Sequence, residues 1–110
     1  MAEDPLQELQ RELARFARER NWEQYHTHRN LAASISAEAG ELLALFRWGQ
    51  DAITDTPERV REELADVFLG VLRFASVGGI DLIGAARDKL ALNAVKYPVD
   101  RVTGPDRPPR

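Results

Sequence analysis

The 110-residue sequence contains no cysteine. This absence excludes disulfide bonds, zinc–thiolate sites and thiol nucleophiles, and it agrees with a reducing compartment. Long apolar runs are also missing, so we expect no membrane-spanning segment and no membrane partner. The N-terminus, MAEDP, is acidic and lacks the basic and apolar regions of a signal peptide. We therefore expect a cytoplasmic protein.

An excess of basic charge is missing as well, because 15 Lys and Arg residues stand against 18 Asp and Glu, for a formal net charge of -3. Without a basic field the chain is not expected to bind a nucleic acid polymer. Hydrophobic residues make up 44% of the sequence and charged residues 30%, which is typical of a folded globular domain. The length suits one hydrophobic core and is too short for two. We predict a single domain whose ligand is a small molecule.

Apolar residues recur at three- and four-residue steps, and no β-alternation competes with this helical period. The first helix is predicted over residues 5–20. A second begins after Thr27, a favourable N-cap, and runs to about Trp48, where Gly49 stops it. Residues 50–56 are predicted to be a polar loop. A third helix then runs from Pro57 to the glycines at 78–79, and a fourth, capped by Asp81, ends before the proline at position 98.

Four helices with short connections predict an all-α, four-helix antiparallel bundle over residues 1–99. Residues 100–110, which include three prolines and a glycine, are predicted to form a flexible tail. The apolar face of the third helix, which includes Leu64 and Phe68, is wide for so small a bundle. We therefore expect the bundle to be completed by a second copy of the chain in a homo-oligomer.

Two acidic pairs lie at the edge of this predicted core. Glu38 occupies the middle of an apolar stripe in the second helix, and Glu41 follows three residues later on the same face. Glu63 and Asp66 repeat this spacing in the third helix. The other members of the interrupted stripe are Leu31, Ile35, Leu42 and Leu45.

Like charges so close together are unfavourable unless a cation or hydrogen bonds compensate them. Ligands that are all oxygen suit a hard ion such as Mg²⁺ or Mn²⁺ and argue against zinc or copper. A di-iron bundle would carry Glu-x-x-His pairs, and both pairs here are wholly acidic. The alternative is that each pair is a solvated surface matched by Arg or Lys.

The segments EAGELL at residues 38–43, EELADV at 62–67 and KLALNAVKYP at 89–98, together with Trp48, resemble the MazG-type all-α nucleotide pyrophosphohydrolases. Within that family the likeness is greatest to the dCTP pyrophosphatase branch. The segments that resemble this branch are WEQYH at residues 22–26 and RNL at residues 29–31. The likeness covers about residues 6–99. The combination of Glu-x-x-Glu and Glu-x-x-Asp is much more specific than either half.

The resemblance implies Mg²⁺-dependent hydrolysis of a nucleoside triphosphate, with dCTP or a modified dCTP as the expected substrate, to the monophosphate and pyrophosphate. It implies that Glu38, Glu41, Glu63 and Asp66 are both the metal ligands and the catalytic residues, with Mn²⁺ as a possible substitute ion. Glu38 or Glu41 would orient or deprotonate the attacking water. The resemblance also implies a homotetramer built as a dimer of dimers.

Eight residues are implied to bind substrate. Trp22 and Trp48 would sandwich the base, and His26 and Asn93 would supply polar contacts that select it. The remaining four are Asn30, Lys89, Lys96 and Tyr97, of which the last three would meet the phosphates.

Each of these has an ordinary structural alternative. The two tryptophans could be core or interface aromatics, Asn93 a helix cap, and His26 a loop histidine bonded to backbone. The lysines could favour the dipole of a helix C-terminus.

One position departs from the dCTP branch. Four residues after the last acidic residue of the motif, that branch carries a tyrosine, whereas this chain has Gly70. The loss of an aromatic hydroxyl opens space and removes a polar contact, which leaves the preferred base open. The alternatives are a dUTP-preferring or broad-specificity pyrophosphatase, or a non-enzymatic helical interaction module that uses its wide apolar face.

Overall fold

The computed structural model describes residues 4–102, and every regular element in that range is helical, which confirms the all-α prediction. The chain divides into two units, Met1–Gly79 and Ile80–Arg110, which we describe separately. The elements of the first unit are α1 (Pro5–Glu19), the 3-10 helix η1 (Glu23–Tyr25), α2 (His28–Ala44), α3 (Ala52–Asp55) and α4 (Pro57–Gly78). Those of the second are α5 (Leu82–Lys96) and α6 (Val99–Val102). Most of the predicted tail, residues 103–110, lies outside the described residues.

The helix starts follow the capping chemistry of the sequence. Asp4 accepts a hydrogen bond from the backbone N–H of Gln7 at 2.9 Å at the start of α1. The Thr27 hydroxyl accepts one from the N–H of Asn30 at 3.1 Å, which confirms the predicted N-cap of α2. These bonds fix where α1 and α2 begin.

The connection between α2 and α4 differs from the predicted polar loop. Regular α2 ends at Ala44, and turns continue it to Gly49, whose φ of 77° reverses the chain. Residues 52–55 then form α3, because Ala52 is buried and the hydroxyl of Thr54 bonds to Asp51 at 2.8 Å. The Thr56 hydroxyl donates to the carbonyl of Ala52 at 3.2 Å and does not cap α4. A single buried alanine offers too little periodicity for sequence reasoning to detect.

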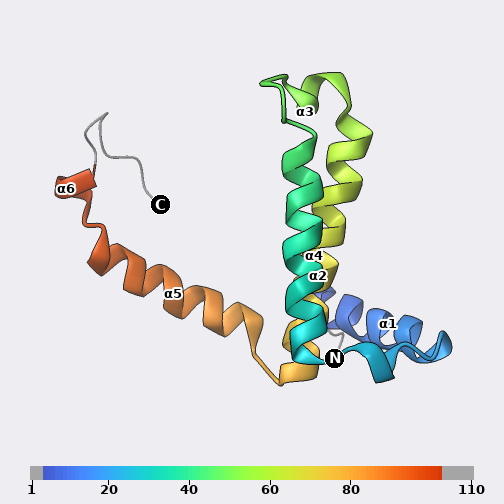
Figure 1. Ribbon diagram of the computed structural model, residues 1–110. Helices are drawn as coiled ribbons and strands as arrows, with labels where there is room; N and C mark the ends of the chain where they lie inside the picture. Colours follow the sequence, from blue (N-terminus) through green and yellow to red (C-terminus); the bar gives the residue numbers. More distant parts are fainter. Residues whose placement is uncertain (1–3, 103–110) are drawn as a thin grey trace. The chain divides into compact units, whose positions relative to one another are not determined.

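The core of the first unit lies along the antiparallel pair α2 and α4, which share the most extensive contact (Figure 1). Helix α1 packs against α4 near the start of α2. There the side-chain amide of Gln10 donates to the carbonyl of Leu72 at 3.3 Å and to the hydroxyl of Ser76 at 3.1 Å. The buried side chains are Ala17, Leu31, Leu45, Ala52, Leu72 and Ala75.

Part of the apolar face of α4 is left uncovered by the first unit. Leu64 is 56% exposed and Phe68 is 45% exposed. Both belong to the apolar face that the sequence predicts to be too wide for so small a bundle to bury. This outcome agrees with the expectation that one chain cannot bury the whole face, and the oligomer itself stays a prediction.

The second unit begins with a capped helix. Asp81 accepts a hydrogen bond from the N–H of Gly84 at 3.1 Å, as predicted, and α5 ends at Lys96, with Tyr97 as its C-cap ahead of the proline. The short helix α6 replaces the first residues of the predicted tail. Whether α5 completes a four-helix bundle stays a prediction. Within residues 4–102 no single helix is long and apolar enough to cross a bilayer, although α4 and α5 taken together reach that length and composition.

Candidate metal and nucleotide site

The acidic pairs are positioned by the stripe that the sequence predicts. The α2 side chains that are not fully exposed are those of Leu31, Ile35, Glu38 and Leu42, and the buried Leu45 follows directly. Glu38 therefore points toward α4 because it sits among residues that must pack there. Glu41, one turn further along, is exposed at the rim of the same seam.

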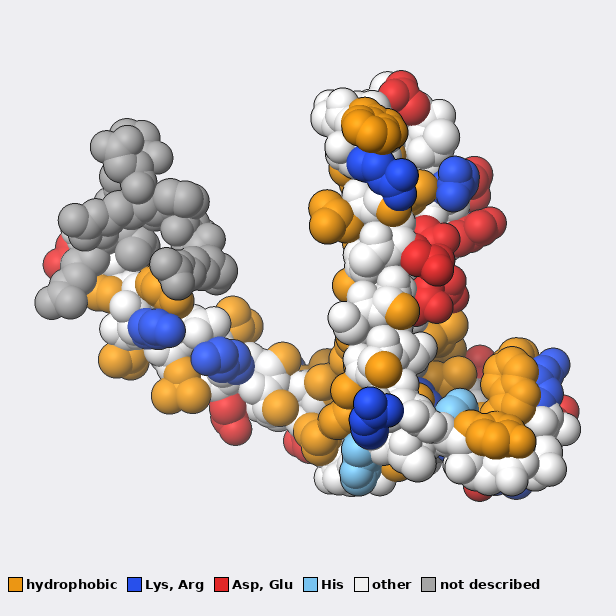
Figure 2. All heavy atoms as spheres, in the orientation of Figure 1, with side chains coloured by type: hydrophobic (Ala, Val, Ile, Leu, Met, Phe, Trp, Pro, Cys, Tyr) orange, Lys and Arg blue, Asp and Glu red, His pale blue; other side chains and the backbone are white. Residues whose placement is uncertain are grey.

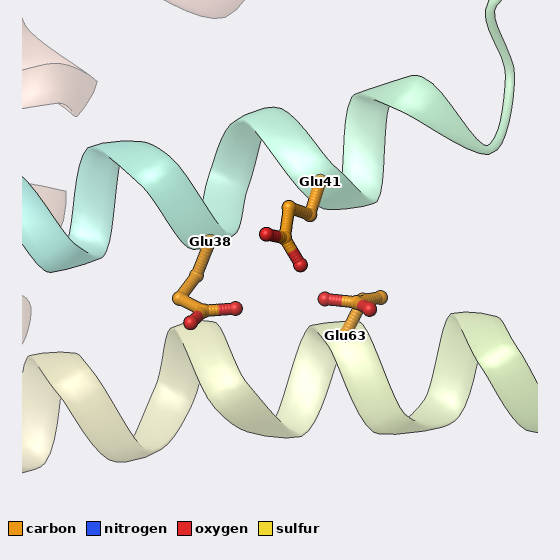
Figure 3. A group of neighbouring side chains, drawn as sticks. All are labelled: Glu38, Glu41 and Glu63. Atoms are coloured by element: carbon orange, nitrogen blue, oxygen red, sulfur yellow. The ribbon is translucent and has the colours of Figure 1, made fainter.

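Three carboxylates converge between the two helices. Glu38 and Glu41 reach down from α2 and Glu63 reaches up from α4, as Figure 3 shows. Each offers one oxygen such that all three oxygens lie within 4.8 Å of one another. Oxygen Oε2 of Glu63 is buried and has no hydrogen-bond partner. The arrangement leaves a desolvated carboxylate oxygen without a hydrogen bond from the described residues.

The electrostatics of the cluster follow from this crowding. Burial raises the pKa of Glu63 above its ordinary value, and the charges of Glu41, Asp66 and Glu38 raise it further. Burial also raises the pKa of Glu38, and the charges of Asp66 and Glu41 add to the rise. Both shifts have the sign expected when like charges share one site without a cation.

Asp66, the fourth predicted ligand, lies beside this cluster and is not one of the three converging residues. It is exposed, and it shares a cavity with Glu38. Its charge acts on both Glu38 and Glu63, so it belongs to the same electrostatic site. The structure thus brings three of the four proposed ligands together and places the fourth next to them.

The donor set fits a hard divalent cation. All of the converging atoms are carboxylate oxygens, and the unpartnered oxygen of Glu63 is the kind of group that a metal ion would satisfy. In Figure 2, Asp and Glu side chains gather part-way along the α2–α4 pair, with Lys and Arg side chains toward the α3 end. A cation bound at this patch would face solvent on one side, where a phosphate could join the site.

A cavity of about 430 Å³ lies on the α3 side of the cluster, and we call it the Trp48 cavity. Glu41 and Glu63 form its acidic wall, and Arg47 and Arg59 bring positive charge to the same space. Trp48 at its rim is 83% exposed, which excludes a role in the core of the first unit. Anionic phosphate groups are the ligands that such a mixture of arginine and metal-binding carboxylate suits.

A second cavity of about 240 Å³ lies on the α1 side of the cluster, and we call it the Trp22 cavity. Glu38 and Asp66 stand at its acidic end. Its walls are largely apolar, and Trp22 meets Phe16 edge-on with ring centroids 5.7 Å apart. The remaining lining residues are Leu13, Ala17, His26, Leu31, Ser34, Leu69, Gly70 and Arg73. An apolar pocket with a few polar groups suits a nucleobase.

His26 lies in this second cavity, but its bonding differs from the backbone-bonded loop histidine considered above. Its ring nitrogen Nδ1 accepts a hydrogen bond from Nε of Arg73 at 2.9 Å. Partial burial and the neighbouring guanidinium lower the pKa of His26, so the neutral ring is favoured. His26 is thereby a fixed polar group of the cavity.

The other predicted substrate contacts of the first unit are not gathered in one cavity. Trp22 and Trp48 line different cavities, so one chain does not form both walls of a base sandwich. Asn30 lines neither cavity, and its side-chain amide donates to the carbonyl of Tyr25 at 3.0 Å, which ties η1 to α2. The other four residues belong to α5 or its C-cap in the second unit, and their substrate contacts stay predictions: Lys89, Asn93, Lys96 and Tyr97.

Sequence reasoning missed three arginines that line the cavities. Arg59 and Arg73 flank the acidic positions on one stripe of α4, which runs 59, 63, 66, 70 and 73 at steps of four and three. That spacing could have identified them as members of the site face. Arg47 lies next to Trp48 in the turns after α2, where no periodicity marks it.

Gly70 has a packing role besides the space it leaves. A Cβ built on Gly70 would lie 3.1 Å from Cγ1 of Ile35 on α2, closer than an ordinary carbon contact. The missing side chain therefore lets α2 and α4 approach closely one turn away from Glu38 and Asp66. Gly70 also lines the Trp22 cavity, and the expectation that the loss of a tyrosine at this position opens space for the substrate stays a prediction.

No protein-family model matches the chain, but individual proteins are clearly similar to it. The dCTP pyrophosphatase 1 of Rattus norvegicus is 38% identical in an alignment of 104 positions, which covers 88% of this chain and 61% of the rat protein. That of Homo sapiens is 37% identical in an alignment of 103 positions, which covers 87% of this chain and 61% of the human protein. The chain thus spans 61% of the length of these curated relatives. The crystal structure of a pyrophosphatase from Archaeoglobus fulgidus matches with a TM-score of 0.83 and 36% identity, covering 89% of this chain and 96% of that one.

Proposed function

We propose that this chain, which belongs to the MazG-like family of all-α pyrophosphohydrolases, hydrolyses dCTP or a modified dCTP to the monophosphate and pyrophosphate. The observation that carries the proposal is the convergence of Glu38, Glu41 and Glu63 between an apolar cavity and an arginine-lined one. The relatives named dCTP pyrophosphatase 1 support the substrate. Removal of unwanted nucleotides from the cellular pool is the corresponding role.

Mg²⁺ is the proposed cofactor, with Mn²⁺ as its substitute, and Glu38, Glu41, Glu63 and Asp66 would hold it. When bound, the ion would supply charge neutralisation for the phosphate oxygens. The protein's own groups do the rest of the positioning. Arg47 and Arg59, which line the Trp48 cavity, would bind the departing pyrophosphate, and the base would stack on Trp22 in the other cavity.

The attacking water needs a carboxylate that can accept a proton or fix its orientation. We assign this role to Glu38 or Glu41, because both reach from α2 into the cluster (Figure 3). Burial raises the pKa of Glu38, which makes it a better proton acceptor than an ordinary glutamate in the metal-free protein. Glu41 is the more exposed and hence the more accessible to water.

We further propose that the enzyme works as a homotetramer formed from two dimers, in the cytoplasm. The exposed apolar side chains of α4 support an assembly, because Leu64 and Phe68 have no cover within their own unit. A neighbouring chain would also supply the second aromatic wall that Trp22 lacks. The absence of cysteine supports a reducing compartment.

The test is pyrophosphate release from a panel of nucleoside triphosphates, with and without Mg²⁺, by the full chain and by two neighbouring variants. Glu63→Gln removes a converging carboxylate with almost no change of shape, and we expect it to lower kcat by about 10²-fold or more. Glu62→Gln is the matched control, because Glu62 is exposed and lies outside the cluster. It should keep the activity of the unmodified chain.

The panel also separates the alternatives. Preferential release from dUTP, or equal release from many nucleotides, would replace dCTP as the substrate and leave the chemistry in place. If no nucleotide is hydrolysed with Mg²⁺ present, while the chain still self-associates, the non-enzymatic interaction module becomes the better description.

A further inference from the structure

We propose that Arg73 determines base specificity, by presenting a pair of N–H donors to the adjacent O2 and N3 acceptors of cytosine in the Trp22 cavity. The inference rests on the proposed function, in that it takes the Trp22 cavity to hold the base of the nucleotide. It assigns to Arg73 a role in base selection that neither the acidic motif nor the aromatic residues indicate.

The position of Arg73 fits this role. It follows Asp66 by seven residues, or about two helical turns, so it lies on the same face of α4 at about 10.5 Å along the helix axis. Both residues line the Trp22 cavity, with Asp66 and Glu38 at one end and Arg73 and His26 at the other. A nucleotide whose phosphates meet the carboxylate cluster would therefore extend its base toward Arg73.

The hydrogen bond to His26 fixes which donors Arg73 can offer. Its Nε–H is used by the Nδ1 atom of His26, at 2.9 Å. The guanidinium then retains four N–H groups on Nη1 and Nη2, and residues 4–102 provide them with no hydrogen-bond partner. Because His26 anchors one edge of the guanidinium, the opposite end is held as a planar fork with little loss of side-chain entropy on binding.

His26 completes a surface that only donates. With Nδ1 accepting from Arg73, the neutral imidazole carries its proton on Nε2, which becomes a donor. The lowered pKa of His26 is consistent with this neutral form. Arg73 and His26 together thus present N–H groups to the cavity and no acceptor.

A surface of donors discriminates among pyrimidines. Cytosine carries two neighbouring acceptors, N3 and O2, which match two parallel N–H groups of a guanidinium. Uracil and thymine carry an N–H at position 3, which would face another donor and leave both groups unpaired. The cavity that Arg73 lines should therefore favour cytosine nucleotides.

The experiment compares binding of dCMP and dUMP, by titration calorimetry with Mg²⁺ present, to the full chain and to three variants. The unmodified chain should prefer dCMP by about 5- to 150-fold, the range for one good bidentate contact to a base edge. Arg73→Gln can offer one donor and one acceptor, so this preference should shrink to less than about threefold. Arg73→Lys keeps the charge but loses the fork, and should shrink it as well. Arg61→Gln is the control, an exposed α4 position outside both cavities.

The ratio of the two affinities is the decisive quantity, because a purely structural or phosphate-binding role would weaken both nucleotides alike. Equal weakening in Arg73→Gln, or an unchanged preference, would overturn the assignment, and so would an unmodified chain that does not bind dCMP. Pyrophosphate release from dCTP is measured in parallel. If dCMP is selected through Arg73 but dCTP is not hydrolysed, the proposed function is wrong and the recognition of cytosine stands.

Discussion

Replacing Gly70 with alanine tests how closely α2 and α4 must approach for their carboxylates to meet. The added Cβ would lie 3.1 Å from Cγ1 of Ile35, whereas two carbons pack best at about 3.5–4.0 Å. Either Ile35 or the helix must therefore move by a few tenths of an ångström. Since Ile35 is part of the stripe that faces α4, such a movement would displace Glu38 as well.

Gly40 provides the reference for this substitution. It lies in the interior of α2, and a Cβ there would meet nothing within 4 Å. Gly40→Ala should stabilise the protein by about 0.5–1 kcal/mol, because alanine restricts the unfolded chain more than glycine does. Gly70→Ala gains the same helix preference but adds an overpacking cost of about 1–3 kcal/mol. It should therefore be about 1–3 kcal/mol less stable than Gly40→Ala, or at least about 4 °C lower in Tm.

Urea unfolding of both variants without metal measures the difference, and calorimetric titration with Mg²⁺ shows whether the displaced cluster binds metal more weakly. Combining Gly70→Ala with Ile35→Ala removes the contact, so Ile35→Ala should cost less in that background than in the unmodified chain. Equal stabilisation by the two glycine substitutions would refute the close approach of α2 and α4 at this point.

Two further predictions concern stability. Leu72→Ala should lower the free energy of unfolding, measured in urea, by about 2–5 kcal/mol, because Leu72 is 0% exposed. Leu43, which is 72% exposed, provides the control, and a loss in Leu72→Ala no larger than that in Leu43→Ala would contradict this packing. Glu63→Gln should raise the Tm of the metal-free protein at neutral pH. A carboxyl whose pKa is raised by folding destabilises the fold as pH rises above its unfolded value, so this gain should vanish at acid pH, where Glu63 is protonated. A gain that persists in acid would contradict the assignment, as would a variant still stabilised by Mg²⁺ as much as the parent.

Local chemistry determined most of the helical framework. Thr27 and Asp81 cap the helices that were predicted to follow them, and Gly49 and Gly79 adopt positive φ where α2 and α4 were expected to stop. Each of these features depends on atoms within about four residues of one another, so the local sequence is sufficient to predict where these helices begin or end. The short helix α3 was not predicted, because its one buried residue, Ala52, becomes buried only when α3 packs against α4.

The sequence also determined which carboxylates matter, since Glu38 interrupts an apolar stripe that has to face another helix. Only the tertiary structure decided how they meet: Glu63 joins Glu38 and Glu41 with a buried, unpartnered oxygen, while Asp66 lies beside them. Only the tertiary structure, too, brings Arg73 into hydrogen-bond contact with His26, 47 residues away in the sequence, and places Gly70 next to Ile35. The physical reason is that helical periodicity assigns each residue to a face, whereas the distance between two faces depends on how the helices pack.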